Sequence, residues 1–215
     1  MSAQRPFAVG IAGGSSSGKS ALIRALVSSL GEDRVATLRY EAYYHDHRDV
    51  PAVQRAALGY EAPEAVDTEL FLEHLASLRA GRAVTPPRFC FSTHRRRSVE
   101  AAVEPRPILL IEGVLLLHDP RVRALLDLTI FLDVPDAVRV SRATRGDAVE
   151  DGHARRSGLR VYDAIARGIH ARYVEPTKAF ADLVLLNAGR LDRVAEIAAT
   201  VILDRVERRA RGAAA

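Results

Sequence analysis

The residues with the clearest chemical meaning are the eight from Gly13 to Ser20, GGSSSGKS. They match G-x-x-x-x-G-K-[ST], follow an apolar run at residues 7–12 and precede helical apolar spacing at residues 21–27. In that context the glycines turn the backbone tightly, so that its N–H groups and the positive helix N-terminus face phosphate oxygens. The lysine reaches the outer phosphates, and the final hydroxyl binds Mg²⁺. We therefore predict a nucleoside triphosphate site formed by Gly13, Gly14, Ser15, Ser16, Ser17, Gly18, Lys19, Ser20 and Ala21.

Two carboxylates stand at the ends of predicted strands. Glu41 follows the segment 34–40, and Glu112 follows the wholly apolar run 108–111. In open parallel sheets, ligands bind at the carboxyl ends of the strands, which is where both residues would lie together with the glycine-rich loop. We therefore predict that Ser20 and Glu112 hold a magnesium ion and that Glu41 lies at the same edge of the sheet.

The elements that must position these groups alternate along the chain. Strands are expected at residues 7–12, 34–40, 108–111, 128–132 and 183–186, and helices at 21–27, 67–80, from about 135, 159–174 and 191–209, with Asp67 as a helix cap. This alternation predicts an α/β fold: a doubly wound, five-stranded parallel sheet with helices on both faces. We expect a single domain over residues 1–215. It would carry a small β-hairpin insertion at about 84–104, in which 88–93 pairs with 98–103, and a mobile lid at about 145–158.

Composition narrows the class of protein. The 215 residues are 48% hydrophobic and 27% charged, with a formal net charge of +4, which is ordinary for a globular domain. The arginines are spread along the chain without a zinc pattern or an RNA-binding signature, so we expect no nucleic acid partner. A single cysteine, Cys90, excludes an internal disulfide framework and fits a reducing compartment. With no signal peptide and no long apolar run, we expect a cytoplasmic protein without membrane contact.

Further motifs, in order along the chain, resemble the uridine–cytidine kinase family of P-loop kinases, within the phosphoribulokinase/uridine kinase superfamily. The resemblance spans roughly residues 7–186. The matching stretches are GIAGGSSSGKS at 10–20, EAYY at 41–44, GYEAPEAVD at 59–67, FCFSTHRR at 89–96, IEGVL at 111–115, FLD at 131–133 and EPTKAFAD at 175–182.

This resemblance implies transfer of the γ-phosphoryl group of ATP or GTP to the 5′-hydroxyl of uridine or cytidine, as in pyrimidine salvage, by a homo-oligomer, a tetramer in the family. It implies that Lys19 holds the phosphates, that Glu41 accepts the hydroxyl proton, and that Arg142 and Arg145 neutralise charge on the transferred group. The nucleoside-binding residues it implies are Tyr44, Tyr60, Glu61, Phe89, Phe91, His94 and His153.

The chain departs from the family pattern mainly on the acceptor side. Glu41 and Glu61 stand where the family has aspartates, Ala62 replaces a histidine, and Cys90 replaces an aspartate. In the lid, Asp151-Gly152-His153 stands in place of Arg-Gly-Arg. Two alternatives therefore remain open: a kinase for another acceptor such as nicotinamide riboside, and a nucleotide-binding protein whose catalysis has decayed. Phe89 and Phe91, two residues apart, would also fit a strand face in the core, and His94 a solvated surface.

Overall fold

The computed structural model describes residues 5–50, 62–90, 93, 95–97, 101–145 and 168–212. Of the predicted site residues, Tyr60, Glu61, Phe91, His94 and His153 lie outside these ranges, as do the predicted lid beyond residue 145 and most of the helix predicted at 159–174.

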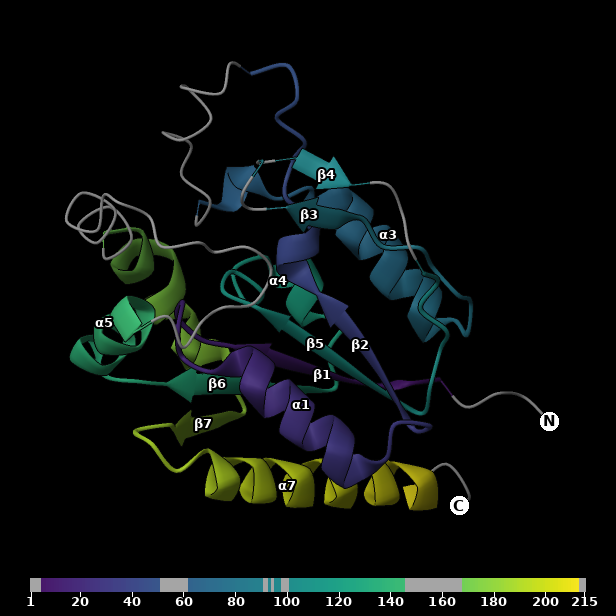
Figure 1. Cartoon of the computed structure of the whole chain (residues 1–215). Helices are drawn as coiled ribbons and strands as arrows, with labels where there is room; N and C mark the ends of the chain where they lie inside the picture. The colour runs from purple at the N-terminus through teal and green to yellow at the C-terminus, as the bar shows by residue number, and fades with distance from the viewer. Residues whose placement is uncertain are drawn as a thin grey trace.

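A five-stranded parallel sheet forms the centre of the fold, as the alternation of elements predicts. Its order is β2 (Val35–Arg39), β5 (Ile108–Gly113), β1 (Phe7–Ala12), β6 (Leu128–Asp133) and β7 (Leu183–Leu186). Strand β5 is thus flanked by β1 and β2, and Glu112 pairs in register with Ile11 on one side and Arg39 on the other. This order brings the segments that follow β1, β2 and β5 to one edge of the sheet (Figure 1).

Each strand divides its side chains between two cores, because alternate residues of a strand point to opposite faces. Val9, Ile11, Leu110 and Ile130 pack with helices α1 (Lys19–Leu30) and α7 (Leu191–Gly212). Ala8, Leu109, Ile111 and Phe131 pack with helices α3 (Thr68–Arg79) and α4 (Pro120–Arg123) on the other side (Figure 1). Both faces of the sheet are therefore covered, which explains why β1 and β5 are buried along their whole length.

Further helices connect these elements. A 3-10 helix at Tyr40–Tyr43 carries Glu41, a second is formed by Pro63–Ala65, and helix α5 spans Asp136–Arg145. A π-helix at His170–Val174 leads into a 3-10 helix at Glu175–Phe180. No helix within these described parts of the chain has the length and apolar character needed to cross a membrane.

The hairpin is present, but its second strand was predicted wrongly. β3 (Arg88–Cys90) pairs antiparallel with β4 (Arg95–Arg97), not with a strand at 98–103. Arg96 donates hydrogen bonds to main-chain carbonyls and so holds β4 in place. A single antiparallel bridge, Val84 to Val103, joins the two ends of the insertion.

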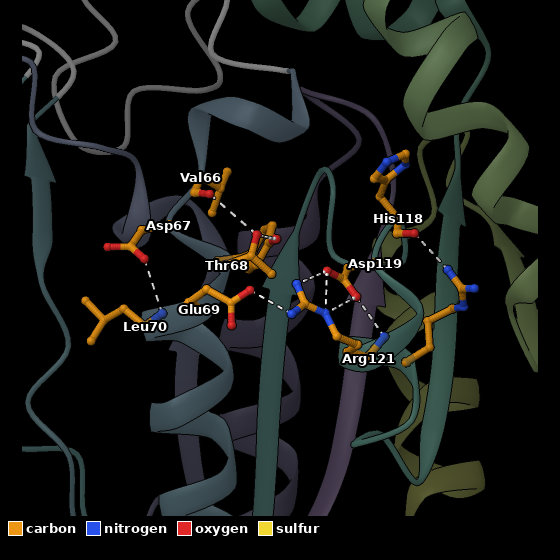
Figure 2. A network of polar contacts seen from close by, with 10 residues as sticks. Val66, Asp67, Thr68, Glu69, Leu70, His118, Asp119 and Arg121 are labelled. Carbon is orange, nitrogen blue, oxygen red and sulfur yellow. Dashed lines mark hydrogen bonds and ion pairs between the residues drawn. The ribbon is translucent and has the colours of Figure 1, made fainter.

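A polar network fixes the N-terminal ends of α3 and α4 (Figure 2). Asp67 caps α3 by accepting from Leu70 N, as predicted, and Asp119 caps α4 by accepting from Arg121 N. The Arg121 guanidinium of α4 bridges Asp119, the N-cap residue of its own helix, and Glu69 of α3. The Tyr40 hydroxyl lies 2.8 Å from Thr68 Oγ1, so the 3-10 helix that carries Glu41 is tied to the first turn of α3.

Candidate functional site

The loop between β1 and α1 has the backbone of a phosphate-binding loop. Gly13 and Gly18 adopt φ angles of 144° and 96°, which residues other than glycine rarely adopt. Ser16, at φ 60°, is the one residue other than glycine with positive φ in the described parts of the chain. Such strained residues are found where a fixed backbone shape is needed for function. Lys19 Nζ donates to the carbonyl oxygens of Gly13 and Gly14 at 3.1 Å each, so the ammonium lies over the loop.

Ser20 and Glu112 meet at the base of this loop. Ser20 Oγ lies 3.1 and 3.0 Å from the two carboxylate oxygens of Glu112, and Arg39 Nε lies 3.2 Å from Oε1. Glu112 is buried, and burial raises the pKa of its carboxyl; the charge of Glu41 raises it further, whereas Lys19 and Arg39 lower it. The predicted pair is therefore in contact, with two cationic side chains beside it.

Magnesium fits this set of donors. Mg²⁺ prefers oxygen ligands and is usually held by one or two protein groups together with waters and substrate phosphates. The described residues contain no cluster of three or more His, Cys, Asp or Glu that could hold a metal without a substrate. A hydroxyl and a carboxylate at the base of a phosphate loop match a metal that arrives with a nucleotide.

Glu41 lies at the same edge, just beyond β2. Its Oε1 accepts a 2.7 Å hydrogen bond from Val114 N, the first residue after β5. This bond orients the carboxylate and links the segment after β2 to the segment after β5. Glu41 lies close enough to Glu112 for its charge to raise the pKa of the Glu112 carboxyl, and Glu112 in turn contacts Ser20 of the phosphate loop.

Of the residues predicted to bind the nucleoside, the structure brings Tyr44 and Phe89 together, with ring centroids 5.3 Å apart and both side chains buried in the core on the α3 face. Cys90, beside Phe89, is buried, and as the single cysteine of the chain it forms no internal disulfide. Arg96 of β4 donates to the carbonyls of Tyr43 and Tyr44 at 2.9 and 2.8 Å, and to Asp67 at 3.1 Å. The hairpin is thereby fastened to the segment that follows Glu41.

Of the two arginines predicted to act from α5, the structure describes the side-chain contacts of Arg142 only. Arg142 donates through Nη1 to Ser17 O at 3.2 Å and through Nη2 to Asn187 O at 3.0 Å, so it contacts the phosphate loop directly. Arg145 is the last residue of α5, and the structure describes its backbone only.

Sequence reasoning did not identify three residues that surround the loop: Arg139, His170 and Asn187. A Cβ on Gly14 would lie 2.8 Å from both Arg139 Nη1 and His170 Cε1, and one on Gly18 would lie 2.9 Å from Asn187 Nδ2. Burial lowers the pKa of the His170 imidazole, as does the nearby Arg139, whereas Glu175 raises it. The sequence offered one signal, that Asn187 is a polar residue directly after a predicted strand.

Unsatisfied polar groups gather at the same place. Within the described residues, four buried side-chain atoms lack a hydrogen-bond partner: Ser17 Oγ, Arg139 Nε, His170 Nδ1 and Asn187 Oδ1. All four belong to the phosphate loop or to side chains that pack against it. Because buried polar groups in folded proteins are nearly always paired, this concentration marks the loop as a site for a polar ligand.

Comparison with known proteins agrees with this geometry. The model of the Phosphoribulokinase / Uridine kinase family matches residues 8–193. The chain belongs to this family. It is 36% identical over 185 residues to a uridine kinase of Chloroflexus aurantiacus, covering 86% of this chain and 88% of that one. It is likewise 36% identical to a uridine kinase of Clostridium perfringens, over 86% and 89% of the two chains.

Solved structures in the same kinase class share the fold. A structure described as a candidate fructose transport system kinase from a Silicibacter species has a TM-score of 0.64 and 26% identity, covering 84% of this chain and 90% of that one. As a member of the phosphoribulokinase/uridine kinase family, the chain is a phosphotransferase that acts on an alcohol acceptor.

Proposed function

We propose that this family member transfers the γ-phosphoryl group of ATP to the 5′-hydroxyl of uridine, with cytidine as a second acceptor and GTP as a second donor. The observation that carries the proposal is the meeting of the phosphate loop, the Ser20–Glu112 pair and Glu41 at one sheet edge. Uridine as the acceptor is supported by the 36% identity to the uridine kinases of Chloroflexus and Clostridium.

The reaction is an in-line displacement in which the protein mainly positions groups and stabilises charge. The bond between Pγ and the β–γ bridging oxygen breaks, a bond from O5′ to Pγ forms, and ADP leaves. The O5′ proton passes to a carboxylate oxygen of Glu41, which acts as general base. Lys19 binds the phosphates, and Arg142 and Arg145 stabilise the transferred group.

Ser20 and Glu112 would hold Mg²⁺, which when bound neutralises phosphate charge. Tyr44, Tyr60, Glu61, Phe89, Phe91, His94 and His153 are proposed to form the nucleoside pocket. By family resemblance we also propose a homotetramer, which analytical ultracentrifugation of the purified chain would test.

The experiment is steady-state ADP release from ATP·Mg²⁺, with uridine, cytidine, nicotinamide riboside and purine nucleosides as acceptors. Lys19→Ala serves as the inactive control, and the phosphorylated product is identified by mass spectrometry. We expect turnover that depends on Lys19 and on uridine or cytidine. If only nicotinamide riboside supports turnover, it and not uridine is the acceptor. If the protein binds ATP but no acceptor stimulates ADP release, the kinase proposal is contradicted.

A further inference from the structure

Asn187 is the only asparagine in the chain and lies directly after β7. It is 2% exposed, and its own N–H is bound at 2.9 Å to the carbonyl of Asp133, at the end of β6. Its side chain therefore projects from a main chain fixed to the sheet. The residue lies at the edge where ligands of such sheets bind, although it belongs to none of the family motifs recognised in the sequence.

Asn187 Nδ2 donates a 2.9 Å hydrogen bond to the carbonyl oxygen of Ser17 in the phosphate loop. Arg142 Nη1 donates to the same oxygen at 3.2 Å, and Arg142 Nη2 donates to the main-chain oxygen of Asn187 at 3.0 Å. The Ser17 carbonyl is thus held by two donors, one from the residue that follows β7 and one from α5. These two bonds fix the orientation of one peptide plane.

That plane is the one joining Ser17 to Gly18. A trans peptide is planar, with its C=O and N–H pointing in opposite directions. Holding the Ser17 oxygen toward Asn187 therefore directs the Gly18 N–H to the other side, where a phosphate loop presents its N–H groups to anions. Gly18 is also the N-cap residue of α1, so this N–H lies at the positive end of the helix.

We infer that Asn187 is a positioning residue for phosphate binding: together with Arg142 it fixes the Ser17–Gly18 peptide, so that the Gly18 N–H is oriented for a bound phosphate chain. The inference rests on the triphosphate binding in the proposed function but not on the identity of the acceptor. It also gives Arg142 a role in the absence of any transferred group.

The test is calorimetric binding of ADP and of inorganic pyrophosphate to the full chain, without any acceptor. Asn187→Leu keeps most of the side-chain volume and removes the donor, and Asn187→Ala is the second variant. Thr200→Ala, at an exposed position on α7, is the matched control. We expect the Asn187 variants to bind both ligands about five- to tenfold more weakly, the usual effect of losing one hydrogen bond, with the control unchanged.

Two results would overturn the inference. Equal affinity of wild type and variants for both ligands, with only the melting temperature lowered, would make Asn187 a structural residue. Weaker ADP binding with unchanged pyrophosphate binding would place Asn187 on the nucleoside part of the nucleotide. Because neither ligand requires an acceptor, a failure of uridine phosphorylation leaves this test intact.

Discussion

Shortening Glu41 by one methylene tests whether this carboxylate is placed for proton transfer. In Glu41→Asp the carboxylate retreats by about 1.5 Å, one C–C bond. The 2.7 Å bond from Val114 N to Oε1 would stretch to about 4 Å, beyond hydrogen-bond distance. Displacement of a reacting group by about 1 Å can cost ~10²-fold in rate, so we expect kcat with uridine to fall about 10²-fold. In this chain the hydrogen bond from Val114 N positions the longer side chain of Glu41.

The assay is ADP release at saturating ATP and uridine, with ADP affinity measured separately by calorimetry. Glu41→Gln, which keeps the length but cannot take a proton, should lose about 10²- to 10⁴-fold in kcat. Glu64→Gln, at an exposed position on a neighbouring 3-10 helix, is the control and should behave as wild type. A Glu41→Asp enzyme with wild-type kcat would refute the argument from distance, and an active Glu41→Gln enzyme would refute the general base itself.

Three further outcomes follow from the contacts. Asp127→Asn weakens the ion pair with the buried Arg79, so we expect the free energy of unfolding to fall by about 3 kcal/mol. The melting temperature followed by circular dichroism should fall by about 6–12 °C. Asp204→Asn, which breaks an exposed ion pair, should not change the melting temperature measurably, and equal effects of the two variants would contradict this reasoning. Burial acts to raise the pKa of Asp67, but the Leu70 N–H and Arg96 lower it overall, so its stabilising effect is present at neutral pH and lost as pH falls through that lowered pKa. The difference in urea midpoint between wild type and Asp67→Asn should therefore shrink from pH 7 to pH 3, and a constant difference would refute the assignment. Glu112→Gln should raise the Mn²⁺ concentration needed for half-saturation by roughly tenfold or more. Mn²⁺ binding is followed by electron paramagnetic resonance with ADP present, and unchanged binding would show that Glu112 is not a ligand of the metal.

The sequence predicted the parts of this molecule that local rules control. All five strands of the main sheet lie where they were predicted. For β1 and β5 the signal is a continuous apolar run, because strands covered on both faces are apolar on both sides. The Asp67 cap followed from the residue preferences at helix N-termini. The contact between Ser20 and Glu112 followed from the rule that the carboxyl ends of parallel strands lie at one edge of the sheet.

Contacts that depend on tertiary packing could not be predicted. The placement of Arg139 and His170 against Gly14 joins segments more than 120 residues from the loop, and nothing in their local sequence signals it. Likewise, Arg96 lies in a run of arginines that suggests a solvated surface, but its partners are main-chain carbonyls 52 and 53 residues earlier in the chain.

The anchoring of the hairpin by Arg96 bears on how such an enzyme can change its acceptor during evolution or in the laboratory. The hairpin carries part of the proposed nucleoside pocket, yet Arg96 also holds the carbonyls of Tyr43 and Tyr44, the last residue of the 3-10 helix that carries Glu41 and the residue after it. Replacing the hairpin to alter substrate choice would therefore also disturb the proposed base. A replacement hairpin that keeps an arginine at this position would change acceptor choice without displacing Glu41. A replacement that lacks the arginine would change acceptor choice and lower turnover together.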